Sequence, residues 1–153
     1  MDYAGPVSLM LGPPRSKTIT KVYIAIFVCF VNKAVHIEVD TNLSTEVFLA
    51  ALRSFIARRG KPRTICSDNG TNFQGAANEL HAIYKILQCT SQMATVQDFL
   101  AIEGCEWKLI ASHGPHFEGL WEAAVKSMKF HLRRTLGSQV AIYEELCTLL
   151  AEI

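Results

Sequence analysis

The stretch KVYIAIFVCFVNKAVHIEV, residues 21–39, predicts the centre of the fold. Residues 21–31 are almost wholly apolar, which is typical of a strand that is buried on both faces. Asn32 and Lys33 favour a turn, and residues 34–39 then alternate between apolar and polar side chains, as a second strand does. We therefore expect an antiparallel pair of strands in the middle of a sheet.

The segments outside this pair predict one mixed α/β domain. Further strands are expected at residues 3–11, 63–67 and 106–110, and helices at 44–59, 75–88, 93–103, from 115 and from about 142. Ser44 is expected to cap the first helix, and Gly60 with Pro62 to end it. The order βββαβααβαα favours a mixed five-stranded sheet with helices on both faces.

The composition predicts a folded chain that lies outside membranes. The 153 residues are 50% hydrophobic and 19% charged, with a net charge of +1, which excludes a disordered class. The longest apolar run, residues 22–31, is too short to span a bilayer, and no basic leader follows Met1. The cysteines are odd in number and form no CxxC pair, which disfavours a disulfide framework or a zinc knuckle. We therefore expect an intracellular protein.

A basic edge runs along the helix that begins at Pro115. At about 100° per residue, four charged side chains fall within roughly 60° of one another. They are Glu122, Lys126, Lys129 and Arg133. A separate apolar stripe consists of Trp121, Val125, Met128 and Leu132. The helix therefore has a core face and, beside it, a charged edge that indicates an external partner.

Three acidic residues are candidates for a metal site. Asp2 lies on the first strand, Asp68 follows the fourth, and Glu122 lies on the helix after the fifth. Carboxylates brought together repel one another unless a divalent cation lies among them. Hard oxygen ligands favour Mg²⁺ or Mn²⁺, and two such ions can activate a water or hydroxyl and stabilise the leaving oxygen of a phosphodiester.

Each of these residues also has a structural interpretation. Asp68 opens a DNG sequence that is common in turns, a terminal Asp2 is usually solvated, and Glu122 with Lys126 is an ordinary i, i+4 pair. His113 and His116 have a spacing that suits a metal, but without a third ligand they fit loop residues or DNA contacts better. Only the combination of the three acids favours a catalytic site.

Four segments resemble the integrase catalytic core of BEL/Pao-type LTR retrotransposons, and the resemblance extends over essentially the whole chain. They are DYAGP (2–6), KAVHIEV (33–39), LSTEVFLAALRSFIARRGKPRTICSDNGTNF (43–73) and HGPHFEGLWEAAVKSMKFHLRR (113–134). The resemblance implies an RNase H-like fold and a DDE triad of Asp2, Asp68 and Glu122, which would be both the catalytic residues and the ligands of two Mg²⁺ or Mn²⁺ ions.

The family's activity supplies the expected reaction and partners. Such an enzyme is an endonuclease and transferase that trims the 3′ ends of element DNA and then joins them to target DNA. We expect Lys126, Lys129 and Arg133 to contact DNA phosphates. Further expected nucleic-acid contacts are Asn69, Thr71, Asn72 and His116. The resemblance also implies homo-oligomers and action in the nucleus, with the cytoplasm as the other compartment, and no small-molecule substrate.

The extent of the chain leaves two alternatives open. Residues 1–153 are expected to be a single core domain truncated at both ends, because only Met1 precedes Asp2 and the family's flanking domains are absent. The first alternative is a catalytically inactive nucleic-acid-binding or oligomerisation module derived from an integrase core. The second is a stand-alone RNase H-like nuclease, which would hydrolyse a hybrid without joining strands.

Overall fold

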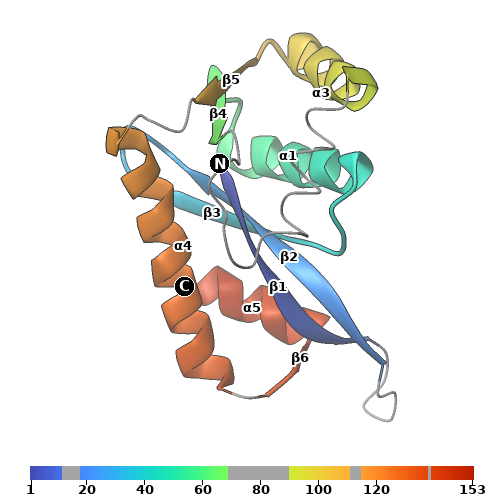
Figure 1. The fold of residues 1–153 in the computed structure, drawn as a ribbon, viewed down its shortest axis with the longest axis vertical. Helices are drawn as coiled ribbons and strands as arrows, with labels where there is room; N and C mark the ends of the chain where they lie inside the picture. Colours follow the sequence, from blue (N-terminus) through green and yellow to red (C-terminus); the bar gives the residue numbers. More distant parts are fainter. Residues whose placement is uncertain (12–17, 69–89, 111–114, 138) are drawn as a thin grey trace.

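The computed structural model describes residues 1–11, 18–68, 90–110, 115–137 and 139–153, and these form a mixed α/β fold (Figure 1). The strands are β1 (Asp2–Leu11), β2 (Thr18–Val28), β3 (Val35–Asp40), β4 (Thr64–Asp68), β5 (Glu106–Ile110) and β6 (Ala141–Ile142). The helices are α1 (Thr45–Arg59), α3 (Thr90–Glu103), α4 (Pro115–Leu136) and α5 (Tyr143–Glu152). The helix expected at 75–88 lies outside the described residues.

The central strand pair is confirmed. β2 pairs with β3 in antiparallel register, from Tyr23 opposite Asp40 to Val28 opposite Val35. The expected turn joins them, because the backbone nitrogen of Cys29 donates to the carbonyl of Ala34 at 2.9 Å. β1 lies antiparallel to β2 on its other side, so that β2 is an interior strand.

The single five-stranded sheet that we expected is not confirmed. The described strands form a four-stranded mixed sheet in the order β3-β2-β1-β6 and a two-stranded parallel sheet of β4 and β5. The two sheets approach each other where β1 begins, since the backbone nitrogen of Met1 donates to the carbonyl of Cys66 in β4. Figure 1 shows the start of β1 beside β4.

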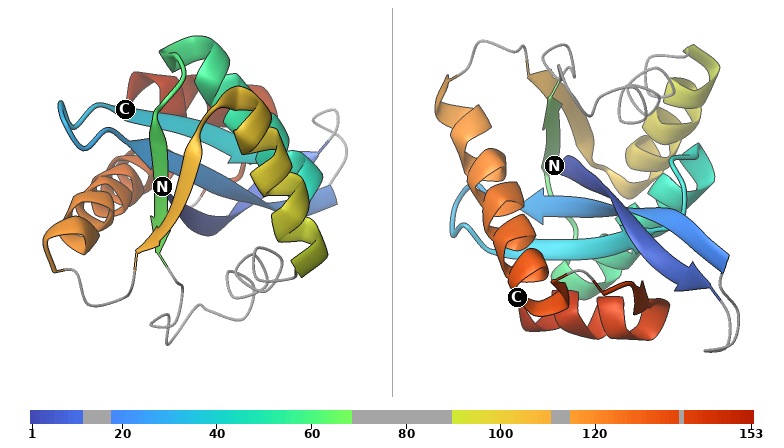
Figure 2. Two further views of the ribbon diagram at one scale, coloured as in Figure 1. Left: turned by 90° about the horizontal axis from the view of Figure 1, so that it is seen from above. Right: turned by 60° about the horizontal axis from the view of Figure 1, so that its bottom comes forward.

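The four-stranded sheet is covered on both faces, as expected (Figure 2). Because successive strand residues point to opposite faces, β2 contributes to two cores. Tyr23, Ala25 and Phe27 belong to the core with α1 and α3. Val22, Ile24 and Ile26 belong to the core with α4 and α5. The continuous apolar run in β2 follows from this double burial.

The ends of α1 lie where the sequence predicts them. The hydroxyl of Ser44 accepts a hydrogen bond from the backbone nitrogen of Val47 at 3.3 Å, which satisfies a donor that has no partner within the helix. At the other end the backbone nitrogen of Gly60, which has a φ of 86°, donates to the carbonyl of Ile56. Glycine adopts such a positive φ without steric cost.

The apolar stripe of α4 is also confirmed as a core face. Trp121, Met128 and Leu132 are buried, and Val125 is half-buried. The charged edge is thereby turned towards solvent. None of the helices in the described ranges is long and apolar enough to cross a bilayer.

Candidate functional site

Asp2 faces the α4 side of the sheet from the start of β1. The strand alternation places it on the same face as Ala4, which packs in the core with α4 and α5. Asp2 is 6% exposed, and its Oδ1 accepts a hydrogen bond from the backbone nitrogen of Tyr3 at 2.8 Å. A buried carboxylate of this kind needs partners, because its desolvation is unfavourable.

Asp2 and Glu122 line the same groove. It has a volume of about 640 Å³ and is lined by Asp2, Glu122, Val125, Lys126, Lys129, Phe130, Arg133 and Arg134. The structure therefore brings together two of the three predicted acids, which come from β1 and α4. The same groove contains all three cations that we expected to contact DNA phosphates, Lys126, Lys129 and Arg133.

For the third acid, Asp68, the structure describes only the backbone. Asp68 is the last residue of β4, where it lies opposite Ile110 of β5. Two residues earlier in β4, the carbonyl of Cys66 accepts the hydrogen bond from Met1. The end of β4 therefore lies near the start of β1, whereas the side chain of Asp68 lies outside the described residues.

Other predicted residues also fall outside the description. Asn69, Thr71 and Asn72 belong to the undescribed segment 69–89, and the side chain of His116 is not described although its backbone begins α4. Among the side chains that the structure describes, no group of three His, Cys, Asp or Glu residues could hold a metal ion. The triad therefore stays a prediction.

The cations of the groove have no acidic partners within the described part of the chain. The ion pairs found there involve other residues, and neither Lys126 nor Lys129 pairs with Glu122. The ordinary i, i+4 pair of Glu122 with Lys126 is therefore not formed. Arg133 and Arg134 lie in the last turn of α4, where the helix dipole favours positive charge. The dipole does not explain Lys126 and Lys129, which lie further from the helix end.

Two residues of the groove were missed by the sequence analysis. Phe130 and Arg134 follow Lys126 at intervals of four residues, so the three side chains form a row along α4. The signal was present in this spacing, but the helical pattern alone did not distinguish a groove from a solvated edge.

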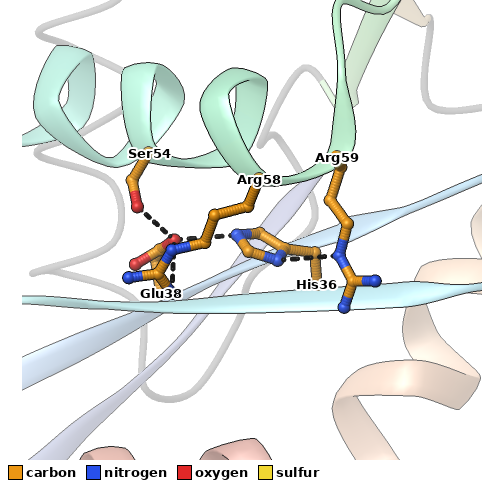
Figure 3. Close-up of polar contacts among 5 residues, drawn as sticks. All are labelled: His36, Glu38, Ser54, Arg58 and Arg59. Carbon is orange, nitrogen blue, oxygen red and sulfur yellow. Dashed lines mark hydrogen bonds and ion pairs between the residues drawn. The ribbon is translucent and has the colours of Figure 1, made fainter.

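A second polar cluster, also missed, lies on the opposite face of the sheet between β3 and α1 (Figure 3). The Oε1 atom of Glu38 accepts from the hydroxyl of Ser54 at 2.6 Å and lies 2.8 Å from Nε2 of His36. Arg58 lies 3.6 Å from the same oxygen, and Nε of Arg59 donates to Nδ1 of His36 at 3.3 Å. Glu38 thus joins β3 to α1.

The bonding pattern of this cluster is that of a structural network. Because Nδ1 of His36 accepts from Arg59, the proton of a neutral imidazole lies on Nε2 and is donated to Glu38. Ser54 donates to Glu38 and not to the imidazole. A nucleophilic serine needs a base within hydrogen-bond reach, so this arrangement does not form a Ser-His-Glu triad.

A buried pair beside this cluster links β1 to β3. The hydroxyl of Tyr3 donates to Oδ2 of Asp40 at 2.6 Å. Burial raises the pKa of Asp40 to about 6, with a smaller contribution from the negative charge of Glu38. Burial, followed by the charge of Asp40, raises the pKa of Tyr3 well above its ordinary value. The pair lies on the face of α1 and not in the groove.

Comparison with known proteins identifies no family for this chain. No protein-family model and no curated protein matches the chain.

Proposed function

We propose that this chain is the catalytic core of a DNA integrase, a metal-dependent polynucleotidyl transferase that processes the 3′ ends of retroelement DNA and transfers them to a target. One observation carries the proposal. Asp2 and Glu122, which are 120 positions apart in sequence, line one groove together with Lys126, Lys129, Arg133 and Arg134. The resemblance of four sequence segments to BEL/Pao integrases supports the same assignment.

The charges in the groove favour a phosphodiester substrate. Four basic side chains without ion-pair partners among the described residues attract a polyanion. The two carboxylates would repel the same polyanion, so their presence there is unfavourable for simple DNA binding. A divalent cation between carboxylate and phosphate removes this conflict, because it binds oxygen atoms of both.

The residues of the site fit such an ion. Asp2 and Glu122 offer only oxygen ligands, which suit Mg²⁺ or Mn²⁺, and we propose Asp68 at the end of β4 as the third ligand. Two bound ions would supply activation of the attacking water or 3′ hydroxyl and stabilisation of the leaving oxygen. Lys126, Lys129 and Arg133 would hold the DNA backbone beside the acids, so that the reacting phosphate stays in place.

The fold proposed for this core is RNase H-like. Three features support this fold: the antiparallel strands β1, β2 and β3, the helices on both faces of their sheet, and the parallel pair of β4 and β5 near the start of β1. In the proposed arrangement β4 continues the sheet beyond β1, which would give the five-stranded order. DNA is the proposed partner, in homo-oligomers that act on chromosomal DNA in the nucleus.

The test is the strand-joining reaction run in reverse on a branched DNA substrate with Mn²⁺. We expect the wild-type chain to release the joined strand, and Glu122→Gln and Asp68→Asn each to lower the rate at least about 100-fold. Glu152→Gln is the matched control, since it removes an exposed helical carboxylate from α5. Glu122 is itself exposed, so its substitution is not expected to disturb folding.

Two outcomes would contradict the proposal. Equal rates in wild type and Glu122→Gln exclude a catalytic role for this carboxylate. Cleavage of an RNA–DNA hybrid without strand joining indicates a nuclease instead.

A second candidate function is DNA binding without catalysis. It is favoured by the basic row of α4, which is sufficient for phosphate contacts whether or not the acids hold a metal. DNA binding that persists in a wild-type chain with no Mn²⁺-dependent activity, and with no Mn²⁺ binding by calorimetry, would support this candidate.

A further inference from the structure

An aromatic side chain is exposed in the middle of the basic groove. Phe130 is 59% exposed and lines the groove with Asp2 and Glu122. At about 100° per residue it lies about 180° around α4 from Trp121, which is 3% exposed in the core. Phe130 therefore does not belong to the core that α4 covers.

The surroundings distinguish Phe130 from other exposed apolar residues. Isolated exposed side chains, such as Val31 and Ile102 here, are normal in soluble proteins. Phe130 instead lies one helical turn from a cation on each side, Lys126 and Arg134. Its only ring neighbour among the described residues is His131, at 5.4 Å between ring centroids and nearly perpendicular. No described ring stacks flat on it.

An aromatic ring between cations suits an unpaired nucleotide. Surfaces that bind single-stranded nucleic acid combine positive charges along the backbone with aromatic rings on which bases stack. A base within a duplex already stacks on its neighbours and does not present its face to a ring. We propose that Phe130 is a stacking platform for an unpaired base at the end of the DNA that the groove binds. This inference rests on the proposed function, because it takes the groove as the DNA site.

The position of the ring specifies which nucleotide it meets. Phe130 follows Glu122 by eight residues, which is about 12 Å along the helix axis. A stacked strand advances about 3.4 Å per nucleotide. The base on Phe130 is therefore within about four nucleotides of the phosphate that reacts beside Glu122. The groove thus prefers DNA ends whose last few base pairs are open.

The inference is tested by binding measurements without a catalytic metal, so that no reaction is needed. Fluorescence anisotropy with the full chain compares a blunt duplex with a duplex that has four unpaired nucleotides at one end. We expect the wild type to bind the open end more tightly, and Phe130→Ala to lose roughly 5- to 100-fold of that affinity with little change for the blunt duplex. Phe130→Trp is expected to retain the preference. Phe130→Leu is the matched control, since it keeps an apolar side chain without a ring, and it should behave as the alanine variant does.

The position is tested with abasic nucleotides placed one at a time along the open end. A loss of affinity at one position within about four nucleotides of the end is expected in the wild type and is expected to vanish in Phe130→Ala. A uniform effect at all positions would contradict stacking at a defined site.

Other outcomes separate this inference from the proposed function. If Phe130→Ala or Phe130→Leu leaves the preference for the open end intact, or if the wild type binds neither DNA, the stacking platform is excluded. If Phe130→Ala changes only the sedimentation of the protein, the ring is a contact between copies of the chain. If Phe130→Ala keeps the wild-type preference for the open end while Glu122→Gln abolishes strand joining, only the stacking platform is excluded and the proposed function stands. A Lys126→Gln, Lys129→Gln double variant with unchanged DNA affinity would exclude the groove, and with it both proposals.

Discussion

Glu38 and Glu122 lie on opposite faces of the same sheet and differ in their partners. Glu38 is 16% exposed and contacts His36, Ser54 and Arg58 on the side of α1. Glu122 is exposed on the side of α4, where no described residue forms an ion pair with it. Both acids lie in the same part of the fold as basic residues, but among the described residues only Glu38 forms ion pairs with them.

The difference separates a face whose polar groups stabilise the fold from the face on which we propose DNA binding. On the α1 face the polar groups satisfy one another, so that they connect β3 to α1 and leave little charge for a ligand. On the α4 face the charges of Lys126 and Lys129 remain available, at a solvated edge where they cost little stability. We therefore expect substitutions on the α1 face to lower the stability of the fold and those on the α4 face to weaken DNA binding.

The largest effect on stability is expected from Glu38→Ala. The substitution leaves the hydroxyl of Ser54 and the imidazole of His36 without their acceptor in a half-buried place, which costs about 2–4 kcal/mol of unfolding free energy. Urea denaturation measures this loss. Glu122→Ala is the matched variant on the other face and is expected to change stability by less than about 0.5 kcal/mol.

The reverse result would contradict the proposed difference between the two faces. If Glu122→Ala destabilises the chain as much as Glu38→Ala does, then Glu122 has a structural role and the separation of the two faces is wrong. A Glu38→Ala, Ser54→Ala double variant sharpens the test, because the two losses should not add when the residues share one hydrogen bond.

A smaller effect is expected in DNA affinity from the loss of one basic residue. Lys129→Gln removes a proposed phosphate contact, so it should weaken DNA binding roughly five- to tenfold at low salt and lower the salt slope by about 0.9. Arg58→Gln is the control, because Arg58 is 66% exposed on the α1 face and already lies beside Glu38. Its salt slope should equal that of the wild type. Equal slopes in all three proteins would contradict a binding role for the α4 face.

A pH dependence of stability is expected on the α1 face. The pKa of Asp40 is raised from 3.8 to about 6 in the folded chain, so the folded state binds its proton more tightly than the unfolded state does. The stability from this group is present below pH 3.8 and is lost as the pH rises through about 6. Asp40→Asn should remove this loss, because an amide oxygen still accepts from Tyr3 and carries no charge.

The measurement is the difference in unfolding free energy between wild type and Asp40→Asn at several pH values. We expect the variant to become more stable relative to the wild type as the pH rises from 4 to 6, where 6 is the approximate pKa of Asp40. Asp98→Asn, an exposed substitution on α3, should show no such trend. A constant difference for Asp40→Asn would show that this carboxyl titrates equally in both states.

Individual residues show why much of the fold could be predicted and why other parts could not. Residues 106–110 form β5 as expected, and Ser44 and Gly60 bound α1, because periodicity and caps are local properties of the chain. β6 was missed, because a strand of two residues is too short to show an alternating sequence pattern. His36 and Glu38 alternate with apolar residues as on a solvated strand face, but α1 covers that face.

The sequence by itself determined strands β1 to β5, the described helices and the charged edge of α4, because each depends on residues a few positions apart. Tertiary structure alone decided that β6 pairs with β1 and that Phe130 shares a groove with Asp2. It also decided that Glu38 contacts Ser54, whereas Glu122 forms no ion pair with any described residue. The physical reason is that strand order and side-chain partners depend on which distant segments pack together. That packing depends on how the whole chain buries its apolar surface, and a local sequence pattern does not specify it.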